Sequence, residues 1–260
     1  MPNKSLEYAP SGPDALTRAA QFRRSAKLNM ISRRQLLYLS ALFSFWYPFA
    51  NSKCFAVAEE KINNNSYFLT IDILKEAYWA EIIASKHYDA FCERALSEKF
   101  PNIAYLFSTL SISEKIHADN YEKLISSLGA TFPKREIPIA VTDTKSNLKI
   151  ASMKELEKIE KFYPNVLKNL QPESHDQAII NCVYSWKSHQ QHEEMINDIR
   201  RYSGFFFRTL AKKIESMKPN DYVCEICGST INEKPKNPCE ICNYALYHYK
   251  NIKRPILSAN

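Results

Sequence analysis

The chain has 260 residues with 45% hydrophobic and 24% charged residues, ordinary globular values that exclude a disordered or collagen-like chain. Its 4 glycines argue against a Rossmann sheet or a turn-rich all-β fold and favour helices. The formal net charge of +7 is concentrated in residues 1–35, so the composition gives no sign of a basic face on the folded part, and no nucleic-acid partner is expected.

Residues 1–58 are predicted to form an N-terminal extension and export signal. Arg33 and Arg34 precede an uncharged apolar stretch, and an Ala-x-Ala site follows at 56–58, as in a secretory signal. The sequence S-R-R-x-L-L resembles a twin-arginine export signal. We expect a periplasmic or otherwise exported protein, cytoplasmic only if the signal is not used. The alternative is an uncleaved membrane anchor, for which the apolar run is short.

Four long helices are predicted in the remaining chain, over 70–97, 101–128, 146–163 and from after Ser174 to 202. Apolar residues recur at three- and four-residue spacing in the first, Gly129 suits the C-terminal cap of the second, and Pro164 follows the third. Residues 131–144 are expected to form an extended crossover. This order predicts a mainly α protein with a ferritin-like four-helix bundle over 66–205, a linker over 206–220 and a small module over 221–250.

Glutamate and histidine are placed so that they could meet inside the bundle. The second helix carries Glu114 and His117, and the fourth carries His189 and His192; a step of three residues puts each pair on one helix face. The first and third helices offer one carboxylate each, Glu81 and Glu155. Carboxylates offset the charge of metal ions and imidazoles add neutral nitrogen ligands, so the pattern predicts a carboxylate–histidine metal site.

The C-terminal segment contains two C-x-x-C motifs, Cys224 with Cys227 and Cys239 with Cys242. Two such motifs at this spacing bring four thiolates into a tetrahedron that suits one iron or one zinc ion. The alternative is a pair of structural disulfides, as in many exported proteins. The equal two-residue spacing favours the metal.

A ferritin-like bundle followed by a rubredoxin-like cysteine module resembles the rubrerythrin family. The resemblance implies a non-haem diiron oxidoreductase that reduces hydrogen peroxide, with electrons from an unidentified donor entering at the single iron of the four cysteines. It also implies a homodimer. By position, Glu81, Glu114, His117, Glu155 and His192 match family metal ligands, and Tyr88 and Tyr163 match tyrosines near the centre. We therefore name Glu81, Tyr88, Glu114, Glu155 and Tyr163 as the expected catalytic residues.

Two positions depart from the family pattern. His189 stands where the fourth helix of the family has a glutamate, and Lys158 stands where the third has a second carboxylate. Both changes raise the free-energy cost of a second metal ion. The site is then a modified diiron centre, a mononuclear centre with three histidines, or a retired one. The functional alternatives are a non-catalytic metal-binding protein with zinc at the cysteines, and electron transfer alone.

Overall fold

The structure is a computed structural model that describes residues 67–131, 133, 135–202 and 207–256. The predicted export signal, residues 1–58, lies outside the described residues. Within these ranges, no helix combines the length and apolar character needed to cross a membrane.

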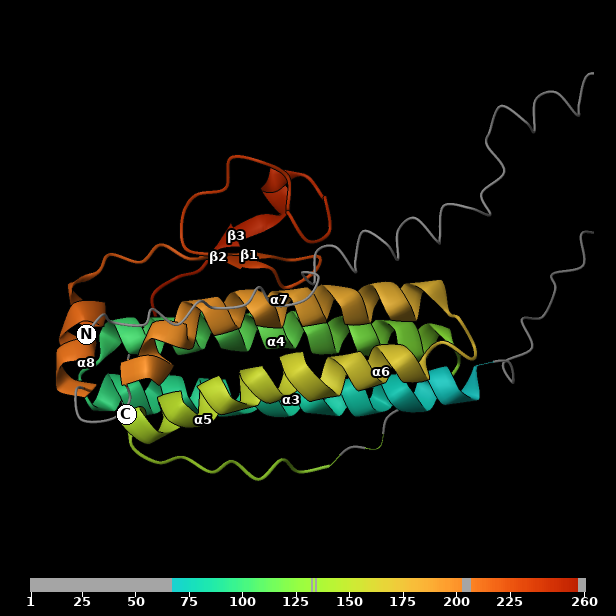
Figure 1. Cartoon of the computed structure of the whole chain (residues 1–260), viewed down its shortest axis with the longest axis horizontal. Coiled ribbons are helices and arrows are strands. Elements are labelled where there is room, and N and C mark those ends of the chain that lie inside the picture. Colours follow the sequence, from blue (N-terminus) through green and yellow to red (C-terminus); the bar gives the residue numbers. More distant parts are fainter. Residues whose placement is uncertain (1–66, 132, 134, 203–206, 257–260) are drawn as a thin grey trace, which may run out of the picture. The chain divides into compact units, whose positions relative to one another are not determined.

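The prediction of a mainly helical chain is confirmed (Figure 1). Helices α3 (Phe68–Ser97) and α4 (Pro101–Ser127) form the first long pair, and α5 (Thr144–Glu157) and α7 (Asp176–Tyr202) complete the bundle. Gly129, just past α4, has φ +78°, a left-handed conformation that is easy for glycine and ends the helix as predicted. The apolar stripes of these helices face one another and form the bundle core.

The expectation that the third helix ends before Pro164 is wrong. After α5 the chain makes one π-helical turn, η2 (Lys158–Phe162), and continues as α6 (Tyr163–Asn169) with Pro164 in its first turn. A proline inside a regular α-helix lacks the N–H donor and clashes with the carbonyl four residues earlier. The wider π-turn changes the hydrogen-bond pattern just before that point. Tyr163, which follows the π-turn, is fully buried.

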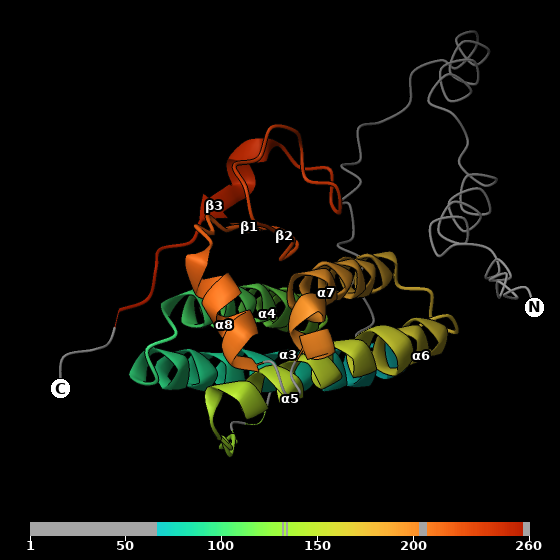
Figure 2. The ribbon, with the colours of Figure 1, turned by 60° about the vertical axis from the view of Figure 1, so that its left-hand side comes forward.

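The C-terminal part begins with helix α8 (Phe207–Ser216), inside the segment predicted as a linker. A three-stranded antiparallel sheet follows, with β1 (Tyr222–Cys224) between β2 (Thr230–Ile231) and β3 (Tyr249–Asn251). A short 3₁₀ turn, Leu246–His248, leads into β3. Both ribbon views place this sheet beside α4 and α7 (Figure 2).

Buried hydrogen bonds attach the cysteine module to α4. The Tyr105 hydroxyl donates to the carbonyl of Ile252 at 2.8 Å and accepts from the amide of Asp221 at 2.9 Å. The Thr109 hydroxyl donates to Asp221 Oδ2 at 2.9 Å. Because these groups are buried and paired with one another, they fix the position of the module on α4.

Glutamates distant in sequence cap the N-termini of α3 and α4, neither of which has a side-chain cap of its own. Glu173 accepts from the backbone amides of Leu69 and Thr70 at 3.0 and 2.7 Å. Glu215 accepts from the amides of Asn102 and Ile103. Each carboxylate also faces the positive end of its helix dipole.

Replacing Glu173 by alanine is expected to lower the free energy of unfolding by about 1 kcal/mol at pH 7. Partial burial opposes ionisation, but the hydrogen bonds from Thr70 hold the pKa of Glu173 below its ordinary value. The contribution of Glu173 to the free energy of unfolding is therefore fully present above the pKa of this residue in the unfolded chain. It is lost as the pH falls through its pKa in the folded chain. Urea unfolding at pH 7 and pH 3 measures it, with Glu76→Ala on the exposed face of α3 as control. An equal loss at both pH values would contradict the capping role.

Candidate metal centres

Six predicted ligands meet in the interior of the bundle, and each is at most 1% exposed. They form two overlapping groups, in each of which the potential ligand atoms all lie within 4.8 Å of one another. One group is Glu81, Glu114, His117 and His189; the other is Glu114, Glu155, His189 and His192. The structure thus brings together all six residues, with Glu114 and His189 shared by the two groups.

His117 and His192 each turn one nitrogen toward the carboxylates and the other toward a partner at the edge of the cluster. Nδ1 of His117 lies 3.1 Å from Glu114 Oε2, and Nδ1 of His192 lies 3.3 Å from Glu155 Oε2. On the outer side, His117 Nε2 lies 3.1 Å from the Cys227 carbonyl and His192 Nε2 lies 3.0 Å from Ser113 Oγ. Outer partners of this kind fix the ring orientation of metal-ligating histidines.

His189 lies between two carboxylates, with Nδ1 2.6 Å from Glu155 Oε2 and Nε2 3.2 Å from Glu81 Oε1. Burial opposes its protonation, but the carboxylates, Glu114 foremost, outweigh burial and raise the pKa of His189 to about 10. Burial lowers the pKa of His117, so that ring is neutral at pH 7. A metal ion at the cluster would displace a proton from His189.

Lys158 also reaches into this cluster. Its Nζ lies 2.5 Å from Glu81 Oε2 and 3.4 Å from Glu114 Oε2, and the residue is 8% exposed. Burial alone would lower the pKa of Lys158, but the surrounding carboxylates raise it above its ordinary value. In turn, although burial acts to raise the pKa of Glu81, Lys158 and His189 hold it well below its usual range. The sequence showed Lys158 as a departure from the family pattern but did not predict this ion pair.

The two predicted tyrosines both donate hydrogen bonds to ligand carboxylates. The Tyr88 hydroxyl donates to Glu155 Oε1 at 2.5 Å, and the Tyr163 hydroxyl donates to Glu81 Oε1. Burial and the neighbouring carboxylates raise the pKa of both phenols well above the ordinary value, so both keep their protons. Sequence reasoning missed Tyr121, whose hydroxyl lies 3.1 Å from that of Tyr163 and extends this network.

One buried oxygen in the cluster indicates that a cation fits there. Among the described residues, Glu114 Oε1 has no hydrogen-bond partner, although the side chain is fully buried. It lies 3.5 and 3.6 Å from Nδ1 of His189 and His192. A buried, unpartnered carboxylate oxygen is unfavourable unless an ion or water satisfies it. Oxygen and imidazole nitrogen donors suit iron and similar divalent metals.

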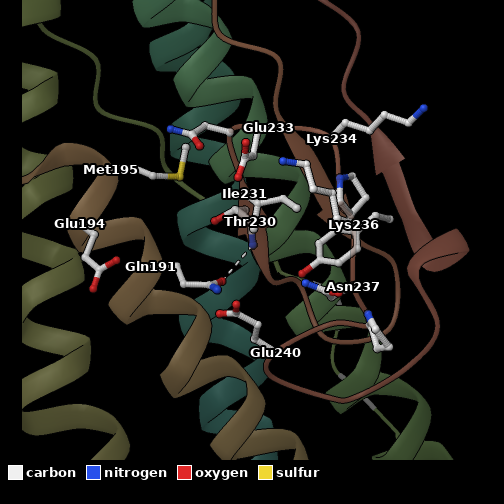
Figure 3. A pocket seen from close by; sticks show the side chains of 14 residues that line it. Gln191, Glu194, Met195, Thr230, Ile231, Glu233, Lys234, Lys236, Asn237 and Glu240 are labelled. Carbon is white, nitrogen blue, oxygen red and sulfur yellow. Dashed lines mark hydrogen bonds between the residues drawn. The ribbon is translucent and has the colours of Figure 1, made fainter.

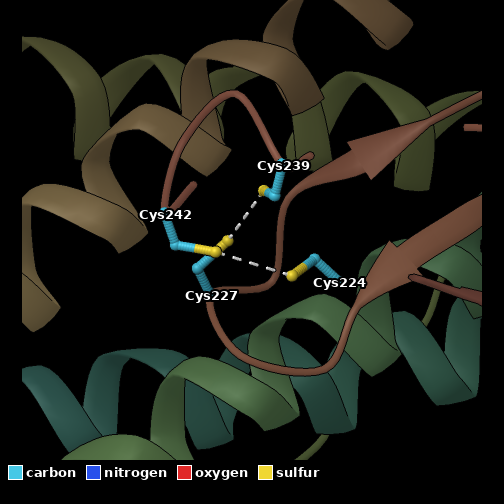
Figure 4. A group of neighbouring side chains, drawn as sticks. All are labelled: Cys224, Cys227, Cys239 and Cys242. Carbon is cyan, nitrogen blue, oxygen red and sulfur yellow. Dashed lines mark hydrogen bonds between the residues drawn. The ribbon is translucent and has the colours of Figure 1, made fainter. Parts of the chain in front are cut away.

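The four predicted cysteine ligands form a second, separate cluster (Figure 4). Sγ atoms lie 3.8 Å apart for Cys224 and Cys242 and 3.5 Å apart for Cys227 and Cys239. A disulfide needs about 2.05 Å, and none of the described cysteines forms one. Thiolates bound tetrahedrally at about 2.3 Å from one metal would be about 3.8 Å apart, so the cluster fits a single iron or zinc ion.

The two clusters adjoin each other at Gly228. Its carbonyl oxygen accepts hydrogen bonds from Ser113 on α4 at 2.6 Å and Ser188 on α7 at 2.9 Å. The residue has φ +77°, and a Cβ there would lie only 2.3 Å from His117 Nε2. Sequence reasoning did not predict these contacts. The positions of Ser113 and Ser188, each directly before a ligand, were the available signal.

A separate cavity of about 450 Å³ lies between α7 and the module (Figure 3). Its wall includes Gln191, whose Oε1 accepts from the Thr230 amide at 3.1 Å, and the side chains of Lys234, Lys236 and Glu240. None of the ten predicted ligands lines it. This cavity is therefore distinct from both metal clusters.

Comparison with known proteins shows similarity to rubrerythrins. Residues 72–199 match the rubrerythrin family model. Rubrerythrin-2 of Clostridium acetobutylicum is 28% identical over 183 residues, which cover 67% of this chain and 91% of that protein.

Two solved structures share the fold. Fully reduced, all-ferrous nigerythrin aligns with a TM-score of 0.59 and 22% identity, covering 75% of this chain and 91% of its own. The Desulfovibrio desulfuricans bacterioferritin, a protein with a diiron site, aligns with a TM-score of 0.51 and 18% identity, covering 58% and 89%. Rubrerythrins bind non-haem iron, and this chain contains both a carboxylate–histidine cluster and a four-cysteine cluster in a ferritin-like fold.

Proposed function

We propose that this chain is a rubrerythrin-type iron oxidoreductase that reduces hydrogen peroxide to water. The observation that carries the proposal is the connection made by His117. One ring nitrogen faces Glu114 in the bundle cluster, and the other donates to the carbonyl of Cys227 at 3.1 Å. A single imidazole therefore links the two places where iron would bind.

The proposed reaction consumes one hydrogen peroxide, two electrons and two protons, breaks the O–O bond and forms two waters. A one-electron carrier protein would supply the electrons singly at the cysteine cluster. Iron held by the bundle cluster would supply the redox chemistry that breaks the O–O bond.

The chain's own residues hold protons beside the cluster. Tyr88 and Tyr163 keep their phenol protons and donate hydrogen bonds to carboxylate oxygens. The ammonium group of Lys158 lies between Glu81 and Glu114. A mainly apolar cavity of about 320 Å³ reaches Tyr88 and Lys158 from outside the cluster. It is large enough to admit peroxide.

Three further expectations belong to this proposal. The first is that the chain is a member of the rubrerythrin family, supported by the match over 72–199. The second is a homodimer, as the resemblance implies. The third is export through the twin-arginine-type signal.

The test is peroxide consumption by iron-loaded protein supplied with a one-electron donor. The Cys242→Ser variant is expected to lose the red colour of a tetrathiolate iron and to lower steady-state turnover more than tenfold, since electrons no longer enter at that cluster. Cys92→Ala, at a buried thiol on α3 outside both clusters, is the matched control and is expected to keep turnover. Turnover that survives in Cys242→Ser would contradict the proposal.

The ion pair between Lys158 and Glu81 favours a second candidate, electron transfer without peroxide chemistry, because a cation already occupies part of the bundle cluster. That function predicts reversible iron redox chemistry at the cysteines with no peroxide consumption. A non-catalytic metal-binding protein with zinc at the cysteines predicts no iron redox chemistry at the cysteines and no peroxide consumption. The same assay, with a visible spectrum, separates the three.

A further inference from the structure

The carboxylates that distinguish the two ligand groups, Glu81 and Glu155, differ in whether the Lys158 ammonium already pairs with them. In the group that contains Glu81, both carboxylates pair with the Lys158 ammonium. Glu81 Oε1 accepts from Tyr163, Glu81 Oε2 accepts from Lys158 at 2.5 Å, and Glu114 Oε2 lies 3.1 Å from His117 and 3.4 Å from Lys158. The ammonium thus lies where a cation in this group would bind.

The other group is different. Its members are Glu114, Glu155, His189 and His192, and no ion pair between Lys158 and Glu155 exists among the described residues. Glu114 is shared by both groups, but its Oε1, the buried oxygen without a hydrogen-bond partner, faces the two histidines of this group. Two imidazole Nδ1 atoms lie within 3.6 Å of that oxygen. This group is therefore the one whose geometry calls for a metal ion.

The net charge of the bundle cluster also favours a single metal ion. A dinuclear bundle site of the usual kind has four carboxylates, whose four negative charges balance two divalent cations. This cluster has three carboxylates, and Lys158 supplies one positive charge. One divalent cation completes the balance, whereas two would leave a buried excess of two positive charges, which is costly at low dielectric.

We propose that the bundle centre holds one divalent metal ion, bound by Glu114, Glu155, His189 and His192, with the Lys158 ammonium in place of the second. This refines the metal centre of the proposed function and rests on that function for the presence of a metal. It replaces the expectation of a diiron site. It also assigns Lys158 a role: its fixed charge keeps Glu81 and Glu114 in position where a second metal would otherwise do so.

The experiment counts Mn²⁺ ions bound by the full chain, because manganese suits carboxylate and imidazole ligands and binds thiolates weakly. Protein first receives one equivalent of zinc, which the four thiolates take. Mn²⁺ is then added and the free ion is followed by electron paramagnetic resonance. We expect one bound Mn²⁺ per wild-type chain, with the spectrum of an isolated ion.

Lys158→Glu restores a carboxylate and removes the ammonium, and is expected to raise the number of bound Mn²⁺ from one to two, with a spin-coupled spectrum. Lys158→Met vacates the position of the ammonium and lowers the excess positive charge of a two-metal cluster from two to one, so a second Mn²⁺ is expected to bind, more weakly than in Lys158→Glu. This variant decides the matter if Lys158→Glu does not fold. Lys154→Glu, at an exposed lysine on α5, is the control and should bind one. Two ions in wild type, or one in both Lys158 variants, would overturn the proposal. The number of bound Mn²⁺ ions does not depend on peroxide turnover, so a failure of the proposed function would be seen separately, in the turnover assay.

Discussion

Replacing Glu114 by glutamine is expected to remove the metal bound within the bundle and, with it, peroxide reduction. Glu114 belongs to both ligand groups and carries the unpartnered oxygen Oε1. An amide of the same shape lacks the negative charge and turns an NH₂ group toward the histidines or toward Lys158. We expect the affinity for Mn²⁺ to fall on the order of 100-fold or more.

Glu157→Gln is the matched control, because Glu157 is an exposed carboxylate on α5 that pairs with Lys154. It should bind metal like the wild type. The cysteine cluster should keep its own metal in both variants, since it shares no ligand with the bundle. Wild-type Mn²⁺ affinity in Glu114→Gln would show that the bundle cluster is not a metal site.

Replacing Gly228 by alanine is expected to have the second large effect. The left-handed conformation at φ +77° costs an L-residue about 1–2 kcal/mol, and the added Cβ would approach His117 Nε2 to 2.3 Å and Ser113 Oγ to 2.9 Å. The module or the histidine must move, so we expect the free energy of unfolding to fall by about 2–4 kcal/mol. Electron transfer from the cysteines to the bundle should slow in the same variant.

The matched control for this change is Asn243→Ala. Asn243 follows the second cysteine pair as Gly228 follows the first, has φ +60°, and is exposed. It therefore reports the backbone strain without the contact to His117. Urea unfolding measures stability, and stopped-flow oxidation of the cysteine iron by peroxide measures electron transfer. Equal effects of the two substitutions would contradict a specific role for the Gly228 contact.

The parts of the structure that depend on local spacing could be predicted from the sequence. A step of three residues puts Glu114 with His117, and His189 with His192, on single helix faces, and apolar periodicity gave the helices that carry them. The two cysteine pairs were equally readable, because a C-x-x-C turn brings both thiols to one ion without help from the rest of the fold.

Features that depend on distant segments could not be predicted. The caps from Glu173 and Glu215 join residues more than one hundred positions apart. The Gly228 carbonyl meets Ser113 and Ser188 only because the module packs against both α4 and α7. Lys158 was visible as an unusual residue, but its pairing with Glu81 depends on how α5 packs against α3 and where the π-turn begins.

The two serine hydroxyls on the Gly228 carbonyl have a mechanical consequence. They come from two different helices and donate to the same oxygen, so the turn after Cys227 cross-links α4 and α7 and fixes the distance between them. Moving the two helices apart would break these hydrogen bonds, and breaking the hydrogen bonds would let the helices move apart. The bundle and the cysteine module should therefore unfold as one cooperative unit. Metal held by the four thiolates then stabilises the helical half of the molecule as well as its own turn.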